Sequence, residues 1–164
     1  MTGVSVWRIF KANRASTAMN GEGAARAGGR WNFPGTPVVY SSSSLALAQL
    51  EVLVHLSGIS PPATYQFVQL TIPTRCAIRE IDLPFLESLL FDWRSHPPHG
   101  LLQQMGDEWI RQGQTPVLKV PSAVSPFEFN YLLNPNHSDF AGVVSSAPVN
   151  LEWDRRLLQR FSGL

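Results

Sequence analysis

Residue types that can do chemistry are concentrated between Gly28 and His55, in the segment GGRWNFPGTPVVYSSSSLALAQLEVLVH. Arg30 follows a glycine pair, which lets the backbone turn tightly and leaves room for the arginine side chain to enter a cavity. Tyr40 closes a short apolar run, and Glu51 is a single carboxylate in an apolar stretch. Together they offer a cation for an anionic group, an aromatic ring for stacking and a carboxylate for a developing positive charge.

The stretch 45–56 predicts a helix whose only strongly polar residues are Gln49, Glu51 and His55. Two interpretations of Glu51 are open. Glu51 and His55 are spaced i, i+4, so they can share one solvated face of the helix. Alternatively Glu51 enters a pocket and is paired there, because burying an isolated charge is costly. The serines before the helix, Ser41 to Ser44, are typical capping and turn residues.

Basic residues outnumber acidic ones in the N-terminal part of the chain, and aromatic residues lie among them. The basic residues are Arg8, Lys11, Arg14, Arg26 and Arg30, against Glu22, and the aromatic ones are Trp7, Phe10 and Trp31. This combination suits a nucleotide diphosphate or a nucleic acid, since guanidinium groups bind phosphate and stack on bases. A loop with scattered solvated charges, with Arg8 at the rim of a strand, is the alternative interpretation.

These residue types fit cleavage of an N-glycosidic bond in a nucleotide, where a fixed carboxylate stabilises the cation that develops on the ribose. No Rossmann or P-loop glycine pattern, Gly-x-Ser-x-Gly motif or zincin helix is present. His96 and His99 flank two prolines without a cysteine or carboxylate pattern, so we predict no metal site there.

The composition predicts a single folded domain over residues 1–164. The chain is 44% hydrophobic and 15% charged, with a net charge of +1, so its overall charge indicates neither a polyanionic partner nor a membrane surface. One cysteine, Cys76, excludes an internal disulfide framework and fits a reducing cytoplasm. Without an apparent leader or spanning segment, we expect a soluble cytoplasmic protein.

The hydrophobic patterns predict strands at both ends of the chain and helices mainly in the middle. We expect an irregular connection over 11–29, a Pro/Gly/Ser connection over 57–63 and a turn-rich approach over 130–135. Strands are expected at 4–10, 38–40, 65–73, 77–81, 115–121, 140–144 and 148–153, and helices at 45–56, 85–93 and 101–111. This arrangement favours an α+β fold with a mixed sheet core and flanking helices.

Five segments, in this order, resemble the RES domain family. They are Trp7-Arg8, GGRWN at 28–32, PVVYSSSSLALAQLEVLVH at 37–55, VPSAVSP at 120–126 and NYLLNP at 130–135. Each motif is weak alone, but the ordered set is fairly specific. The following loop, NPNHS at 134–138, departs from the acidic, proline-containing version expected in the family.

The resemblance implies a fold similar to ADP-ribosyltransferase toxins, with NAD in a cleft and no further cofactor. The arginine, glutamate and serine that name the family match Arg30, Glu51 and Ser122. By the same resemblance, Arg8 and Arg30 hold the NAD phosphates, and Tyr40 packs on the nicotinamide or its ribose. Glu51 stabilises the oxocarbenium-like transition state and Ser122 orients the substrate.

The resemblance also implies a toxin of a bacterial toxin-antitoxin pair, neutralised by an Xre-like helix-turn-helix antitoxin. The expected activity is NAD depletion by hydrolysis or phosphorolysis, and the alternative is mono-ADP-ribosylation of a cellular protein. A nucleic-acid-binding regulatory module is a further alternative, against which the net charge of +1 and the lack of a nucleic-acid motif count.

Overall fold

The computed structural model describes residues 2–56 and 64–159, and the connection expected over 57–63 lies outside the described residues. Eight strands form one sheet: β1 (Gly3–Lys11), β2 (Val39–Ser42), β3 (Tyr65–Pro73), β4 (Ile78–Glu80), β5 (Val117–Pro121), β6 (Phe129–Leu133), β7 (Val144–Ser145) and β8 (Val149–Asn150). The helices are η1 (Ala12–Thr17), α1 (Glu22–Ala27), α2 (Leu45–Leu53), α3 (Leu83–Glu87), α4 (Gly100–Gln112), η2 (Ser138–Gly142) and α5 (Arg155–Gln159).

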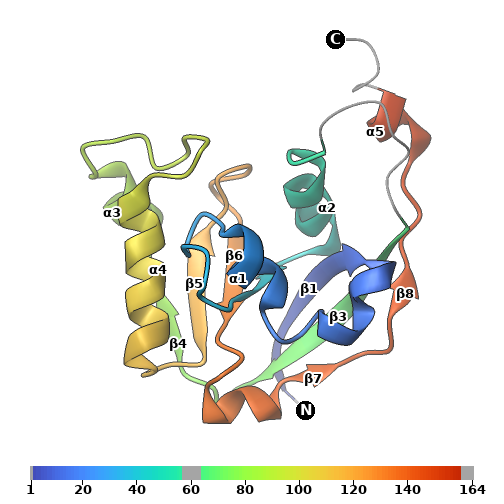
Figure 1. The fold of residues 1–164 in the computed structure, drawn as a ribbon, viewed down its shortest axis with the longest axis horizontal. Coiled ribbons are helices and arrows are strands. Elements are labelled where there is room, and N and C mark those ends of the chain that lie inside the picture. The colour runs from blue at the N-terminus through green and yellow to red at the C-terminus, as the bar shows by residue number, and fades with distance from the viewer. Residues whose placement is uncertain (1, 57–63, 160–164) are drawn as a thin grey trace.

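The strand order is β4-β5-β6-β2-β1-β3-β7, and β8 also pairs with β3. Strands β4 and β5 are parallel, whereas the other pairs are antiparallel. Figure 1 shows α3 and α4 beside β4 and β5 at one end of the sheet, and α2 near β1 in the middle. The predicted α+β class with a mixed sheet core and flanking helices is therefore confirmed.

The sheet buries one apolar core on each face. Alternation along β5 assigns the faces, because Val117 belongs to the first core and Leu118 to the second. The first core holds Val6, Phe10, Ala18, Val39, Val68, Leu70, Ile72, Cys76, Val117, Tyr131 and Leu133. The second holds Trp31, Val38, Ile81, Leu86, Trp93, Leu102, Trp109, Leu118, Val120 and Leu132. Helices α3 and α4 thus cover the second face.

Several predicted elements are confirmed with small shifts in their bounds. The strand over 65–73 is β3 itself, and β1 and β5 lie within two residues of the predicted bounds. Helix α2 begins at Leu45, where the Ser44 hydroxyl accepts a hydrogen bond from the Leu47 amide (3.0 Å). The serine run therefore caps this helix, as its residue type indicates.

Other predictions were wrong, and tertiary contacts explain why. The connection over 11–29 contains η1 and α1, and the expected turn over 130–135 is largely β6, paired on both edges in the middle of the sheet. Pairing with two neighbours overrides the weak strand propensity of asparagine. The helix predicted over 85–93 ends at Glu87 in α3, and the chain beyond it brings Trp93 into the second core.

The C-terminal strands are shorter than predicted. Residues 138–142 form η2 in place of the first part of the strand expected over 140–144. Strands β7 and β8 have two residues each and are exposed, and both pair with β3. Short edge strands limit pairing with other chains. No helix among residues 2–56 and 64–159 combines the length and apolar character required to cross a bilayer.

Candidate active site

A row of paired residues on the second face of the sheet carries the site. Trp7 of β1 pairs with Ser42 of β2, Ser42 pairs with Asn130 of β6, and Asn130 pairs with Val120 of β5. Paired residues in adjacent strands point to the same face. Ser122 follows β5 directly, so three polar side chains from three neighbouring strands gather under α2.

Glu51 of α2 meets this row through one of its oxygens. Its Oε1 accepts hydrogen bonds from Ser122 Oγ (2.6 Å) and Asn130 Nδ2 (2.6 Å). Among the described residues, no hydrogen bond reaches Oε2. Of the two interpretations left open by the sequence, the paired carboxylate is therefore correct, and His55 one turn later is an exposed residue. Hydrogen bonds to an ionised group are short and strong, and they fix the carboxylate in one orientation.

Ser122 is fully buried, and all of its hydrogen-bonding capacity is used within the protein. Its hydroxyl donates to Glu51 and accepts from the amides of Val124 and Ser125, both at 3.1 Å. Because its only hydroxyl proton is donated to Glu51, Ser122 acts on that carboxylate. Its direct contact with a substrate, expected from the family resemblance, stays a prediction.

Asn130 is a site residue that the sequence reasoning missed. Its Oδ1 accepts from Ser42 Oγ (2.8 Å) while its Nδ2 donates to Glu51. The sequence contains a signal for this role, because Asn130 is a polar residue within the otherwise apolar run FNYLL. It was assigned to a turn because an Asn-Pro pair follows that run.

The GGRWN turn is folded tightly around Tyr40. Gly28 has φ of 72°, a conformation that favours glycine, and a Cβ on Gly29 would lie 2.7 Å from Tyr40 Oη. The Tyr40 hydroxyl accepts from the Trp31 amide (3.1 Å) and donates to Asn32 Oδ1 (2.7 Å). Gly29 therefore gives clearance to the tyrosine, and Gly28 supplies the backbone conformation of the turn. Burial raises the pKa of Tyr40, so this hydroxyl stays protonated and remains a donor.

Asn32 holds the same turn from inside. It is fully buried, and its Nδ2 donates to the carbonyls of Ala24 (2.9 Å), Phe33 (3.1 Å) and Thr36 (3.1 Å). Sequence reasoning treated this residue as part of a motif without a role of its own. Its contacts make it the centre of the turn that carries Arg30.

Arg30 leaves this turn toward the loop after α3. Its Nη1 donates to the carbonyls of Trp93 (2.7 Å) and Ser95 (3.0 Å). Partial burial lowers the pKa of Arg30, and the nearby Glu51 carboxylate opposes that lowering by charge attraction. The structure thus brings Arg30, Tyr40, Glu51 and Ser122 to one region of the second face.

Arg8 is placed differently. It shares its side of β1 with Val6 and Phe10 of the first core. Its Nε donates to the Ala18 carbonyl and its Nη1 to the Tyr40 carbonyl, both at 2.7 Å. Burial lowers the pKa of Arg8 to about 10, so the guanidinium remains charged at neutral pH. The observed contacts join β1 to β2 and to the segment after η1, and contact with a phosphate stays a prediction.

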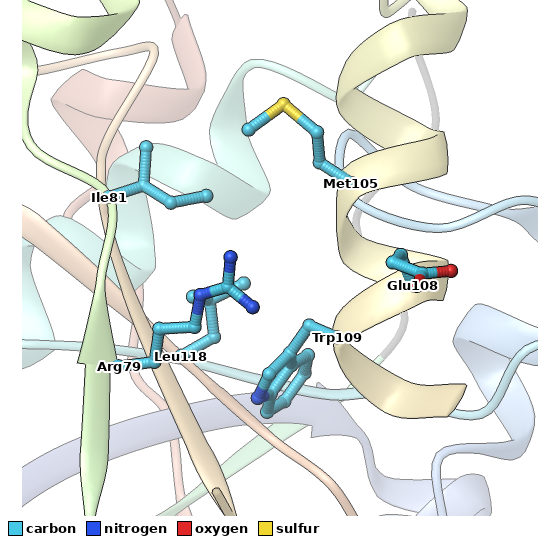
Figure 2. Close-up of a pocket in the computed structure, with 6 residues that line it drawn as sticks. All are labelled: Arg79, Ile81, Met105, Glu108, Trp109 and Leu118. Atoms are coloured by element: carbon cyan, nitrogen blue, oxygen red, sulfur yellow. The ribbon is translucent and has the colours of Figure 1, made fainter. Parts of the chain in front are cut away.

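Helix α4 holds the GGRWN turn against the sheet. Gln103 Nε2 donates to the carbonyls of Gly29 (3.0 Å) and Asn32 (3.2 Å), and Asp107 Oδ1 accepts from the Phe33 amide (3.2 Å). The side of α4 toward β4 and β5 lines a small cavity of about 110 Å³, shown in Figure 2. None of the site residues named above lines that cavity.

The histidines over 96–99 make aromatic contacts. His96 packs against His55, with ring centroids 5.9 Å apart, and His99 stacks on Phe91 at 3.7 Å. In the part of the chain that the structure describes, no group of three or more His, Cys, Asp or Glu residues is arranged to hold a metal ion.

Comparisons with known proteins agree with this architecture. The model of the RES domain matches residues 5–154. The "Prs ADP-ribosylating toxin" of Sphingobium sp. (strain YBL2) is 34% identical over 159 residues, covering 95% of this chain and 98% of that protein. A protein named "Toxin Res" from Pseudomonas putida (strain KT2440) is 36% identical over 150 residues, covering 90% and 92%.

A solved structure is similar across the whole fold. A chain of the crystal structure of the M. tuberculosis MbcT–MbcA toxin-antitoxin complex superposes with a TM-score of 0.76, covering 99% of this chain and 91% of that chain at 22% identity. The sheet, its flanking helices and the hydrogen-bonded carboxylate define an α+β protein with an enzyme-like site. The chain belongs to the RES domain family.

Proposed function

We propose that this protein is a toxin that cleaves the bond between nicotinamide and ribose in NAD. The observation that carries the proposal is the Glu51 carboxylate, held through Oε1 by Ser122 and Asn130, with the Arg30 guanidinium near enough to interact with it by charge. A carboxylate fixed in this way can direct its second oxygen, Oε2, at the positive charge that develops on the ribose of the bound substrate. Preorganised charges of this kind give large transition-state stabilisation.

In the proposed reaction, the electron pair of the glycosidic C–N bond leaves with nicotinamide and neutralises its pyridinium nitrogen. The ribose carbon becomes oxocarbenium-like and is stabilised by Glu51. The oxygen of an acceptor then bonds to that carbon, and the acceptor's proton passes to solvent. NAD is the substrate, and no further cofactor enters this scheme. The reaction is assigned to the cytoplasm, where this substrate is available.

Arg30 is the proposed ligand of the diphosphate. Its Nη1 is held by two neutral carbonyls, of Trp93 and Ser95. A phosphate oxygen forms a stronger, charge-assisted bond with a guanidinium than a carbonyl does, so a diphosphate can displace these contacts. Tyr40, fixed by Trp31 and Asn32, offers its ring to the nicotinamide end. Arg8 is proposed as a second phosphate contact by the family resemblance alone; its Nη2 group is the donor to use, and its side chain lies on the first face of the sheet.

The test is release of nicotinamide from NAD by the purified protein, measured by chromatography. Glu51→Gln keeps the shape of the side chain and an oxygen for Ser122 and Asn130 but removes the negative charge. Loss of one electrostatic contact at a transition state lowers kcat by about 100-fold or more. Retention of wild-type turnover by Glu51→Gln, with thermal unfolding unchanged, would contradict the proposal.

The second candidate is mono-ADP-ribosylation of a protein, and the relative from Sphingobium, which is named an ADP-ribosylating toxin, favours it. Both activities begin with cleavage of the same bond and differ in the acceptor, which is water, phosphate or a protein. Phosphate added to the assay separates hydrolysis from phosphorolysis by the product formed. Labelled NAD in a cell lysate marks a protein band only if a protein is the acceptor. Salt-dependent nucleic-acid binding without NAD turnover would contradict both.

We also propose an antitoxin partner of the Xre-like helix-turn-helix type. The support is the name of the structural neighbour, a toxin-antitoxin complex, together with the family assignment. Co-expression with the protein encoded beside this chain tests the proposal. Co-purification of the two proteins with loss of NAD turnover is the expected result, and full turnover in the presence of that protein would contradict it.

A further inference from the structure

Asn130 occupies a position from which it can control the orientation of Glu51. It lies in β6, between Ser42 of β2 and Val120 of β5 in the register of the sheet. A carboxylate accepts hydrogen bonds only, so the amide end that faces Glu51 must be Nδ2. The carbonyl end then faces Ser42, whose hydroxyl donates to it at 2.8 Å. The network therefore admits one orientation of the asparagine amide.

We infer that Asn130, held by Ser42, is a positioning residue that fixes Glu51 so that Oε2 faces the ribose of the substrate. This inference rests on the function proposed above and adds a residue to it. Asn130 acts through Glu51, and no contact between Asn130 and NAD is part of the inference.

Two donors on one oxygen explain how the orientation is fixed. Ser122 Oγ and Asn130 Nδ2 both reach Oε1 at 2.6 Å, from the end of β5 and from β6. Each donor is itself held, Ser122 by the amides of Val124 and Ser125 and Asn130 by Ser42. A glutamate side chain on a helix has several rotatable bonds. With a single donor, the carboxylate can still rotate about that one hydrogen bond, whereas a second donor prevents this rotation. Supporting contacts of this kind set the precision of a catalytic group.

The charged and titratable groups around Glu51 determine what a change at Asn130 does. Arg30, from the GGRWN turn, is the cation whose charge interacts with Glu51. His55 lies just beyond the C-terminal end of α2, and His96 of the loop before α4 packs against His55. From the sheet side, Ser122 and Asn130 are uncharged donors. Asn130→Asp adds a carboxylate of the same size on the side where Glu51 now meets a donor.

Asn130→Asp is therefore expected to make turnover depend on pH. Two adjacent carboxyl groups share a proton, and the protonated form restores a donor to Glu51 Oε1. Above the pH at which this proton is lost, the two carboxylates repel each other and Glu51 leaves its position. We expect kcat to fall by about 100-fold at pH 8 and to recover toward the wild-type value near pH 5. KM should stay within about threefold, because binding contacts are unchanged.

Two further variants accompany this experiment. Asn150→Asp is the matched control, because Asn150 of the exposed strand β8 accepts a hydrogen bond from Gln66 of β3 (3.0 Å), in a contact exposed to solvent. The pH profile of kcat in Asn150→Asp should follow that of the wild type. Ser42→Ala keeps Asn130 but frees its amide, and loss of a supporting hydrogen bond of this kind lowers kcat by about 10-fold. Ser42→Ala also carries the test if Asn130→Asp does not fold.

The outcomes separate this inference from the proposed function. Wild-type kcat for Asn130→Asp at every pH would overturn the inference, and so would a raised KM with unchanged kcat. If the wild type itself releases no nicotinamide, the proposed function fails. The positioning is then read from crystal structures of the wild type and of Asn130→Asp at pH 8, which require no substrate. Loss of the contact between Glu51 Oε1 and Ser122 Oγ in Asn130→Asp supports the inference, and an unchanged Glu51 side chain overturns it.

Discussion

Gly106 lies inside α4 at the point where this helix meets the GGRWN turn. A Cβ added there would lie 1.7 Å from the carbonyl oxygen of Trp31 and 2.7 Å from its carbonyl carbon. Both atoms belong to the backbone, so no side-chain rotation can relieve the overlap. Gly106→Ala must move either α4 or the turn that carries Arg30.

The size of the effect follows from two opposing contributions. Alanine is more favourable than glycine inside a helix by about 1 kcal/mol. Overpacking of a close contact costs about 1–3 kcal/mol, and an overlap with backbone atoms falls at the upper end of that range. We expect a net loss of about 2 kcal/mol in the free energy of unfolding. With a urea dependence of about 1–3 kcal/mol per molar, the unfolding midpoint falls by about 1 M.

Gly23→Ala is the matched control for this prediction. Gly23 lies in the helix α1, and nothing stands within 4 Å of the position that its Cβ would take. The same substitution should therefore stabilise the protein, by about 0.4–1 kcal/mol. Urea unfolding followed by circular dichroism measures both variants. A Gly106→Ala protein as stable as the wild type would refute the claim that α4 is in backbone contact with the turn.

Three further predictions concern the buried hydrogen bonds of the site. Ser122→Ala leaves two half-buried amides without an acceptor and should lower the free energy of unfolding by about 1–2 kcal/mol; no change in the urea midpoint would argue against it. Asn32→Ala removes an amide that donates to three carbonyls and should cost about 3 kcal/mol, measured in the same way. Burial raises the folded-state pKa of Tyr40 above its ordinary value of 10.0. The protonated Tyr40 hydroxyl therefore makes its full contribution to the free energy of unfolding below pH 10. This contribution is lost as the pH rises further, by up to about 1.4 kcal/mol per pH unit. Above pH 10, the free energy of unfolding should fall less steeply with pH in Tyr40→Phe than in the wild type. Identical slopes in the two proteins would contradict this prediction.

Local signals account for the parts of the fold that were predicted correctly. Ser44 caps α2 because its side chain accepts from an amide three residues later, a contact that involves only neighbours in the chain. The alternation over 65–73 likewise predicted β3 because successive strand residues face opposite sides. For the site, residue types and the family resemblance indicated Arg30, Tyr40, Glu51 and Ser122.

Contacts between distant residues account for what the sequence could not predict. Strand β6 forms because β5 and β2 pair with both of its edges, so its residues resembled a turn when taken alone. The same pairing brings Asn130 to Glu51, 79 positions away in the chain. Arg8 and Tyr40 are adjacent in space, yet their side chains lie on opposite faces of the sheet, because the strand register sets the face of each.

The sequence by itself determined that the chain carries a carboxylate on an apolar helix, an arginine after paired glycines and a tyrosine on a short strand. It could not determine whether Glu51 faced solvent or a partner, because helical spacing allowed both. The tertiary structure decided this by placing Ser122 and Asn130 on a single oxygen of Glu51. The physical reason is that a half-buried charge requires donors, and these donors come from β5 and β6, which only the folded sheet brings under α2.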